Sequence, residues 1–464
     1  MTITIRVTID GDENVEEVAR FERGELQAGN LGITLAEAKS LLARLQTATV
    51  VQQTSGWIAQ HRHCLDCGAA LRRNGQHAIV LRTVFGKLNI ASPRFYRCCS
   101  AGRGRARFSP LAERTTPELR YLQTKWAALM SYGMTVGLLK DVVPVSDGLS
   151  VAAIRKDVAR AAQRLDAELG DERDAFVDDT ALDWQQLPDP AGPLVVGIDG
   201  GYVHARNQKR GEGWFEVIVG KSIPAAGDPK CFGFVSRFDA KPKRRLHDML
   251  ASQGLQMNQQ IVFLSDGGDT VRDLQMRMSP QAEHILDWFH VSMRVRLMRQ
   301  LALGLTNAVR AAQPELQSDA DGETATRFEL IADITGLKWN LWHGNVRRAL
   351  EIVDDLSCEV ASLPHASESK PKLVRMLREF DGYIDANRTF IPNYGDRWRN
   401  DEAISSAFAE SAVNQIVSWR FVKKQQMRWS ERGSHHLLQI RTRVLNNEWR
   451  ATMARWNPGM IAAA

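Results

Sequence analysis

The sequence is poor in cysteine and contains no long apolar run. Six cysteines among 464 residues cannot staple a scaffold of this size, so packing has to hold the fold together. No stretch approaches the roughly 18 apolar residues of a membrane-spanning helix. The start, MTITIRVTIDGDENVEE, lacks the basic opening and apolar centre of a secretory signal. These absences predict a cytoplasmic protein that makes no membrane contact.

A glycine-rich phosphate loop of the nucleotide-binding type is also missing. Any chemistry on phosphates should therefore need metal but no ATP. The formal net charge of +6 is modest, yet it favours a polyanionic partner. A chain of this length exceeds one compact core and should form several domains.

From residue 193 the pattern changes to short apolar or β-branched runs that end in glycine or aspartate. Such runs, bounded by turn residues, predict successive strands of one sheet. Helical periodicity dominates before and after them, so we expect an α/β protein. The runs are LVVGIDGGYVHARN, WFEVIVGKSI, CFGFVSRF, IVFLSDGG and HILDWFHV.

Two of these runs place an aspartate directly before a glycine pair. Asp199 lies in VVGIDGG and Asp266 in VFLSDGG, each after an apolar run. We expect both residues at strand ends on one edge of the sheet, where their carboxylates suit Mg²⁺ and two-metal phosphodiester chemistry. The alternative, that each Asp-Gly pair is ordinary turn chemistry, stays open.

Four of the six cysteines cluster. Cys64 and Cys67 form a C-x-x-C knuckle, and Cys98 and Cys99 follow about 30 residues later, after strand-like runs. Two thiolate pairs around strands resemble a zinc ribbon with a structural Zn²⁺. Adjacent cysteines do not both ligate one zinc comfortably, so a histidine at 61 or 63 could complete the set, or the thiols stay free.

Two helical patterns separated by a short break lie between residues 125 and 165. They resemble a helix-turn-helix whose second helix offers Arg155, Lys156 and Arg160 to duplex DNA. The break is longer than usual for that motif, and any helical hairpin has a similar pattern.

Four sequence blocks carry a family resemblance: GIDGGYV, FLSDGGDTVRDL, ILDWFHVSMRV and AESAVNQIVSWRFVKKQQMRWS. In content and order they resemble the blocks of Kra-type bacterial insertion-sequence transposases, relatives of the Mutator-like group. The resemblance covers most of the chain. It implies an RNase H-like catalytic domain interrupted by an all-helical insertion, with an N-terminal zinc-ribbon-like and helical DNA-binding region.

The resemblance also implies roles for single residues. Asp199, Asp266 and Glu410 match the catalytic carboxylates, which bind Mg²⁺ or Mn²⁺, and Asp287 and His290 match its D-x-x-H block. From the residues alone Glu410 cannot be distinguished from its acidic neighbours at 401 and 402. The 144 residues from Asp266 to Glu410 leave room for the helical insertion.

With the patterns along the chain, the resemblance predicts seven segments. They are an N-terminal strand and helix (1–60), a zinc-ribbon-like module (61–112), a helix-turn-helix-like region (113–170), a linker (171–192), the first part of the catalytic domain (193–290), the helical insertion (291–400) and the C-terminal helical part of the catalytic domain (401–464).

Two basic segments lie near the predicted catalytic blocks. Lys243 and Arg244 belong to KPKRR, and Lys423 and Lys424 follow Glu410. We expect them to contact the DNA backbone, although a solvated helix face would have the same composition.

The sequence therefore predicts a DDE-type transposase. It would cleave DNA at the terminal inverted repeats of its element and join the ends to target DNA, as a homo-oligomer in the bacterial nucleoid. Two alternatives stay open: a domesticated or inactive transposase that acts as a DNA-binding regulator, and a stand-alone RNase H-like nuclease that cleaves without joining.

Overall fold

The chain forms two compact units in a computed structural model. Unit 1 consists of Met1–Arg164 and Asn447–Ala464, and unit 2 of Leu165–Asn446. The described residues are 1–8, 16–64, 67–96, 109–173, 187–190, 192–206, 213–225, 227–276, 278, 282–312, 322–363, 368–406, 411–422 and 427–460.

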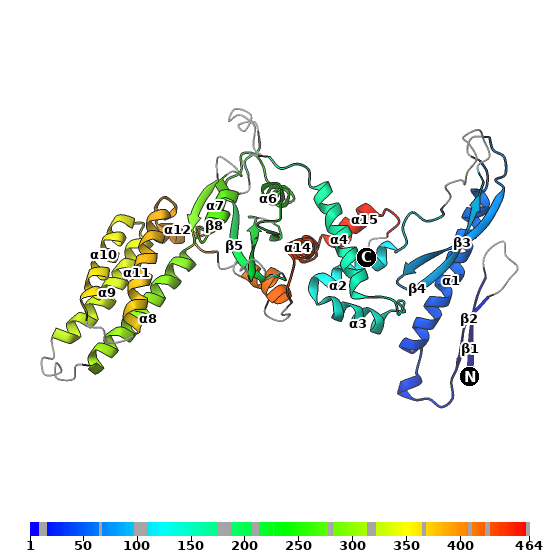
Figure 1. Cartoon of the computed structure of the whole chain (residues 1–464), viewed down its shortest axis with the longest axis horizontal. Helices are drawn as coiled ribbons and strands as arrows, with labels where there is room; N and C mark the ends of the chain where they lie inside the picture. The colour runs from blue at the N-terminus through cyan, green and yellow to red at the C-terminus, as the bar shows by residue number, and fades with distance from the viewer. Residues whose placement is uncertain are drawn as a thin grey trace. The chain divides into compact units, whose positions relative to one another are not determined.

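A strand pair and a long helix open unit 1 (Figure 1). The helix begins with a capping box, in which Thr34 and Glu37 each accept a hydrogen bond from the other's backbone N–H, as the sequence suggests for a helix start here. Arg23 pairs with Glu37 at 2.7 Å and so ties the strands to this helix end. The elements are β1 (Thr2–Val7), β2 (Glu16–Glu22), η1 (Ala28–Asn30) and α1 (Leu35–Gln60).

A hairpin follows in the segment predicted to be zinc-ribbon-like. The antiparallel strands β3 (Arg73–Thr83) and β4 (Gly86–Phe95) alternate buried and exposed side chains. Their buried side chains form a small core with Val50 of α1. The strand-like runs expected after the first cysteine pair are therefore confirmed.

Helices complete unit 1: α2 (Pro117–Leu129), α3 (Tyr132–Val142), α4 (Val151–Glu168) as far as Arg164, and α15 (Trp449–Trp456). Eight residues, 143–150, separate α3 from α4, so the connection exceeds the three or four residues of a usual helix-turn-helix.

The C-terminal helix α15 packs on α2 within unit 1. The indole of Trp449 donates to the Thr124 hydroxyl at 3.0 Å, and Arg450 pairs with Glu118 at 2.8 Å, both on α2. The predicted C-terminal segment 401–464 is therefore divided near residue 446. The burial of Trp449 against α2 gives the physical reason.

Unit 2 is built on one five-stranded mixed sheet, which confirms the predicted α/β class. Its strand order is β7-β6-β5-β8-β9, antiparallel from β7 to β5 and parallel from β5 to β9. All five predicted runs form strands: β5 (Leu194–His204), β6 (Trp214–Ile223), β7 (Lys230–Val235), β8 (Ile261–Ser265) and β9 (Glu283–Leu286).

Helices cover both faces of this sheet. On one face, α6 (Pro242–Ala251) and α7 (Asp269–Met276) bury leucines against Val196 and Phe263. On the other, α14 (Glu431–Leu445) lies on β7, and the π-helical segment η4 (Asn414–Val422) lies on β5.

Between β9 and η4 the chain forms a helical bundle, drawn at the left of Figure 1. One apolar core runs from Leu264 and Ile285 of the sheet into the bundle helices. The bundle is therefore joined to the sheet by packing as well as by the chain. Its elements are α8 (Trp288–Ala312), α9 (Gly322–Trp342), α10 (Val346–Ser362), α11 (Ser369–Ala386), η3 (Arg388–Phe390) and α12 (Tyr394–Arg399).

Among the described helices, none is long and apolar enough to cross a membrane.

A buried ion network holds α6 in place and predicts a large stability effect. Arg245 is 8% exposed, and its guanidinium pairs with Asp239 at 2.7 Å and with Asp166 at 2.9 Å. Arg245→Met would leave the carboxylate of Asp239 buried without its cation. We expect a loss of about 3–5 kcal/mol in the free energy of unfolding, measured by urea denaturation.

The matched control is Arg375→Met, because Arg375 pairs with Glu379 on the surface with its side chain 79% exposed. This change should cost less than about 1 kcal/mol. Equal losses in the two variants would contradict a special role for the Arg245 network.

Candidate active site

Three aspartates from three parallel strands lie at one level of the sheet. β5 pairs with β8 through Gly197↔Leu264, and β8 pairs with β9 through Ser265↔Leu286. Two residues further along the first pairing, Asp199 lies opposite Asp266. One residue further along the second pairing, Asp266 lies opposite Asp287. Since neighbouring strands lie about 4.8 Å apart, the structure brings these three predicted residues together.

Asp199 does not end its strand, which corrects the sequence-based expectation. β5 continues through Gly200 and Gly201 to His204, and Asp199 pairs with Val219 of β6. A Cβ atom at Gly201 would lie 3.4 Å from Val413, just before η4. This glycine therefore serves the close packing of a helix on the strand rather than a turn.

Asp266 lies directly after β8, as expected, in a turn that the bundle holds. Gly267 has φ +81, and its carbonyl accepts from Arg272 at 2.7 Å. The same guanidinium donates to the side-chain oxygen of Asn387, at the end of α11. Gly268 N–H donates to Oδ1 of Asp266 at 3.0 Å. Oδ2 of Asp266 accepts no hydrogen bond from the described residues, so it is available to a ligand.

Asp287 has a different environment, because it is completely buried. Oδ1 accepts from the backbone N–H groups of Phe289 and Ser406, both at 2.9 Å, and Oδ2 interacts with the Ser406 hydroxyl and the His290 ring. Burial raises the pKa of Asp287, but the hydrogen bonds from His290 and Ser406 outweigh it and lower the pKa. With four hydrogen bonds, this carboxylate positions its neighbours.

His290 is hydrogen-bonded to Asp287 and interacts with the charges of Asp199 and Asp266. Its Nδ1 is 2.8 Å from Oδ2 of Asp287, so Nδ1 carries the proton and Nε2 is directed elsewhere. Burial lowers the pKa of His290, but the hydrogen bond and charge of Asp287, with the charges of Asp199 and Asp266, raise it overall. The imidazolium form is therefore favoured among these carboxylates.

Two further residues reach this site from the bundle, and the sequence does not single them out. The Tyr383 hydroxyl on α11 is buried without a hydrogen-bond partner among the described residues. Burial raises its pKa, Arg294 lowers it, and the charges of Asp266 and Asp287 raise it further. The Arg294 guanidinium lies 4.2 Å from the Tyr383 ring centroid. In the sequence, the only sign that Arg294 lies near this site is its position four residues after His290 on the same helix.

Glu410, Lys423 and Lys424 lie outside the described residues, but both flanks of Glu410 are described. Ser406, four residues earlier, is hydrogen-bonded to Asp287, and Val413, three residues later, packs at Gly201. The buried Arg441 of α14 donates to the Ile416 carbonyl of η4 at 2.8 Å. The chain on either side of Glu410 is thus anchored beside the aspartate row.

Among the described residues, no group of three His, Cys, Asp or Glu side chains is arranged to hold a metal ion. Cys98 and Cys99 also lie outside the described residues. The backbone of Cys64 is hydrogen-bonded, because Gly68 N–H donates to the Cys64 carbonyl and Cys64 N–H donates to the Ala69 carbonyl, both at 2.9 Å. The His61 ring stacks on Trp57 and contacts its carbonyl, so it is engaged at the end of α1.

The predicted DNA-binding residues divide into two kinds. Arg155, Lys156 and Arg160 are exposed on α4. Arg244, by contrast, donates to the Leu169 carbonyl at 2.7 Å, and the backbone N–H groups of Lys243 and Arg244 bind the Glu172 carboxylate. KPKRR therefore attaches α6 to the segment that follows α4, and its contact with DNA stays a prediction.

Comparison with protein-family models and with curated proteins finds no match to this chain.

The turn at Gly267 should make the stability of the fold sensitive to substitution of this glycine. A Cβ atom there would overlap the side-chain amide of Asn387 and lie 2.9 Å from Leu286, at a φ of +81 that L side chains rarely adopt. Gly267→Ala should lower the free energy of unfolding by about 1–3 kcal/mol, measured by thermal and urea denaturation.

Gly382→Ala is the matched control, because a Cβ atom at this position of α11 meets nothing within 4 Å. It should leave stability unchanged or raise it by up to about 1 kcal/mol. If Gly267→Ala behaves like the control, the turn is not held as described.

The hydrogen bond from His290 to Asp287 leads to a prediction about the pKa of His290. Asp287→Asn removes the hydrogen-bonded charge that raises the His290 pKa, so this pKa should fall. The measurement is a pH titration of the histidine ring resonances in labelled protein without divalent metal. Asp269→Asn, which removes a fully exposed carboxylate on α7, should leave the His290 titration in place, and an unchanged titration in Asp287→Asn would refute the assignment.

Proposed function

We propose that the protein is a DNA transposase of the DDE type, which cleaves DNA at terminal inverted repeats and joins the ends to target DNA. The observation that carries this proposal is the level row of Asp199, Asp266 and Asp287, with His290 hydrogen-bonded to Asp287. A mixed sheet with a helical insertion after β9 supports the RNase H-like catalytic domain that the resemblance to Kra-type transposases implies.

Asp199, Asp266 and Glu410 would hold the metal ions. Asp266 is partly exposed and has an oxygen available, while the buried Asp287 uses both oxygens on other groups. The described flanks of Glu410 support its assignment to this site, because Ser406 is hydrogen-bonded to Asp287 and Val413 packs at Gly201. When bound, two Mg²⁺ or Mn²⁺ ions supply activation of the attacking oxygen and stabilisation of the leaving oxygen.

The remaining side chains would bind and orient the scissile phosphate. Asp287 holds the ring of His290 through Nδ1 and raises its pKa. When the ring is protonated, Nε2 also carries a hydrogen and can donate to a phosphate oxygen. Arg294 adds a cation one helical turn further along α8, and the buried Tyr383 hydroxyl beside it offers a donor. Asp287 is therefore a positioning residue, and His290 the group that touches substrate.

Unit 1 would bind the ends of the element. The exposed cations of α4 support backbone contacts with a duplex. The backbone hydrogen bonds of Cys64 with Gly68 and Ala69 support a knuckle in which Cys64 and Cys67 would bind a structural Zn²⁺, completed by Cys98 and Cys99. We further propose that copies of the chain assemble on DNA as a homo-oligomer in the nucleoid.

The test uses purified protein, fluorescent DNA that carries the element ends, and Mg²⁺ or Mn²⁺. Asp199→Asn, Asp266→Asn and Glu410→Gln should each reduce strand cleavage by at least about 10²–10³-fold, since each removes a charge that acts on the transition state. End binding in gel-shift assays should persist.

Glu402→Gln is the matched control for Glu410, because Glu402 pairs with Arg397 at 3.0 Å. It should keep nearly full cleavage, and the reverse result would move the third carboxylate to Glu402. Cleavage without joining to target DNA would indicate the nuclease, and DNA binding without cleavage in either metal would indicate the regulator.

A further inference from the structure

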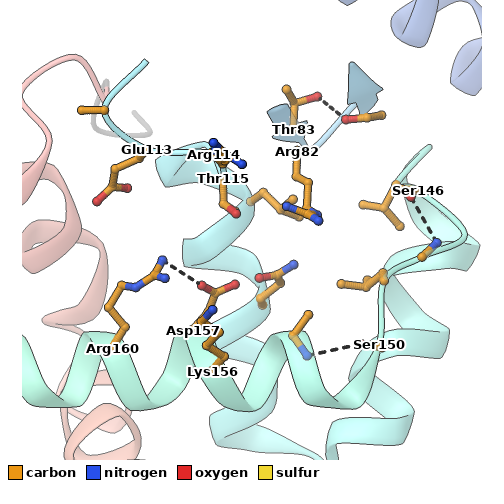
Figure 2. Close-up of a pocket in the computed structure, with 18 residues that line it drawn as sticks. Arg82, Thr83, Glu113, Arg114, Thr115, Ser146, Ser150, Lys156, Asp157 and Arg160 are labelled. Atoms are coloured by element: carbon orange, nitrogen blue, oxygen red, sulfur yellow. Dashed lines mark hydrogen bonds and ion pairs between the residues drawn. The ribbon is translucent and has the colours of Figure 1, made fainter. Parts of the chain in front are cut away.

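Unit 1 contains a pocket that is separate from the aspartate row and has a cavity volume of about 610 Å³. Figure 2 shows Arg82, Arg114 and Thr115 on one side and the α4 residues Lys156 and Arg160 on the opposite side. The wall that carries Arg82 is rigid, because Arg82 N–H donates to the Arg114 carbonyl and Thr116 N–H to the Arg82 carbonyl, both at 2.9 Å.

The rim of this pocket has an excess of positive charge. Its lining contains four cations and two carboxylates, Glu113 and Asp157. Both carboxylates already have cations: Glu113 pairs with Arg120 at 2.6 Å, and Asp157 with Arg160 at 3.6 Å. The side chains of Arg82, Arg114 and Lys156 form no ion pair with the described residues, so they can bind an anion.

The floor of the pocket holds a polar atom that lacks a partner. Gln123 lines the pocket and is 2% exposed, yet its Oε1 accepts no hydrogen bond from the described residues. A buried acceptor in this state costs about 1–3 kcal/mol unless a ligand or water donates to it. Apolar side chains beside it, including Leu119 and Leu149, offer surface to a flat ring.

We propose that this pocket binds one unpaired nucleotide of a DNA strand. The phosphate would lie on Arg82, Arg114 and Lys156, the base would enter between the apolar walls, and its amino or imino group would donate to Gln123. The volume supports a nucleotide over an isolated phosphate, because small-molecule pockets measure about 300–1,000 Å³. The base has to be unpaired, since a paired base keeps its hydrogen-bonding edge inside the duplex.

That the nucleotide belongs to DNA rests on the proposed function, whereas the pocket chemistry does not. If the enzyme works on element ends, a base extruded near the end would be held in unit 1 while strand cleavage occurs in unit 2. This proposal therefore assigns unit 1 a task beyond backbone contact.

The experiment measures fluorescence anisotropy of the full-length protein in buffer without added Mg²⁺ or Mn²⁺ and without chelator, so that no cleavage occurs and a structural Zn²⁺ stays bound. The two probes are a labelled duplex and the same duplex with one bulged nucleotide. Wild type should bind the bulged probe at least about 10-fold more tightly. Arg82→Gln with Arg114→Gln should remove most of this preference, and Arg44→Gln, an exposed charge on α1 outside the pocket, should not.

Gln123→Leu tests the floor separately. It should reduce the preference for the bulged probe while binding of the paired probe stays within about twofold, and circular dichroism should show native folding. If Gln123→Leu unfolds, the rim pair of substitutions decides. Equal binding of the two probes by wild type, or an unchanged preference in the rim variant, would overturn the proposal.

Competition with deoxynucleoside monophosphates distinguishes the source of the ligand. If a monophosphate competes only at concentrations at least about 100-fold above the Kd of the bulged probe, the pocket holds the nucleotide as part of a strand. If a monophosphate competes at concentrations near the Kd of the bulged probe, the ligand of the pocket is a free nucleotide, and the assignment to DNA is overturned. Because the assay needs no catalysis, it can fail while Asp199-dependent cleavage persists, and it can succeed where cleavage is absent.

Discussion

The buried carboxylate of Asp287 is the interaction on which the candidate site depends. It joins the end of β9, the first turn of α8 and the returning chain at Ser406 through four hydrogen bonds. A buried charge is tolerable only when it is satisfied in this way. One side chain is thus hydrogen-bonded to the chain just before the bundle and just after it, so the positions of the site and the bundle are coupled.

The bundle contributes more than a spacer between catalytic blocks. Its core continues from the sheet, and its helix α11 supplies Asn387 to the turn after Asp266 and Tyr383 to the space beside the aspartates. Displacement of α11 would therefore move the Asp266 turn directly. Such a coupling explains why so long an insertion can lie between two parts of one site without loosening it.

The two glycine pairs illustrate how one sequence pattern serves two structural purposes. Gly267 adopts a positive φ and forms a turn, whereas Gly201 stays extended and allows η4 to approach β5. The basic segments separate in the same way. Arg244 donates to the Leu169 carbonyl just after α4. Arg82 and Arg114, which belong to no distinctive motif, both line a pocket.

The sequence by itself determined the elements and their class. Five apolar runs became five strands, Thr34 capped its helix, and Asp266 followed its strand, because periodicity and capping are properties of neighbouring residues. The pairing of Asp199 with Asp266 was a reasonable prediction, since parallel strands end at one edge. The role of Glu410 came only from the family resemblance and stays a prediction.

Only the tertiary structure decided which residues surround those aspartates and where the chain's last helix packs. Asn387, Tyr383 and Ser406 lie about 100 or more residues along the chain from the aspartates they approach, and no local pattern records such contacts. The same holds for Trp449, whose partner Thr124 is 325 residues away. Strand register and the packing of buried side chains select these neighbours, because both depend on the whole core and not on any single segment.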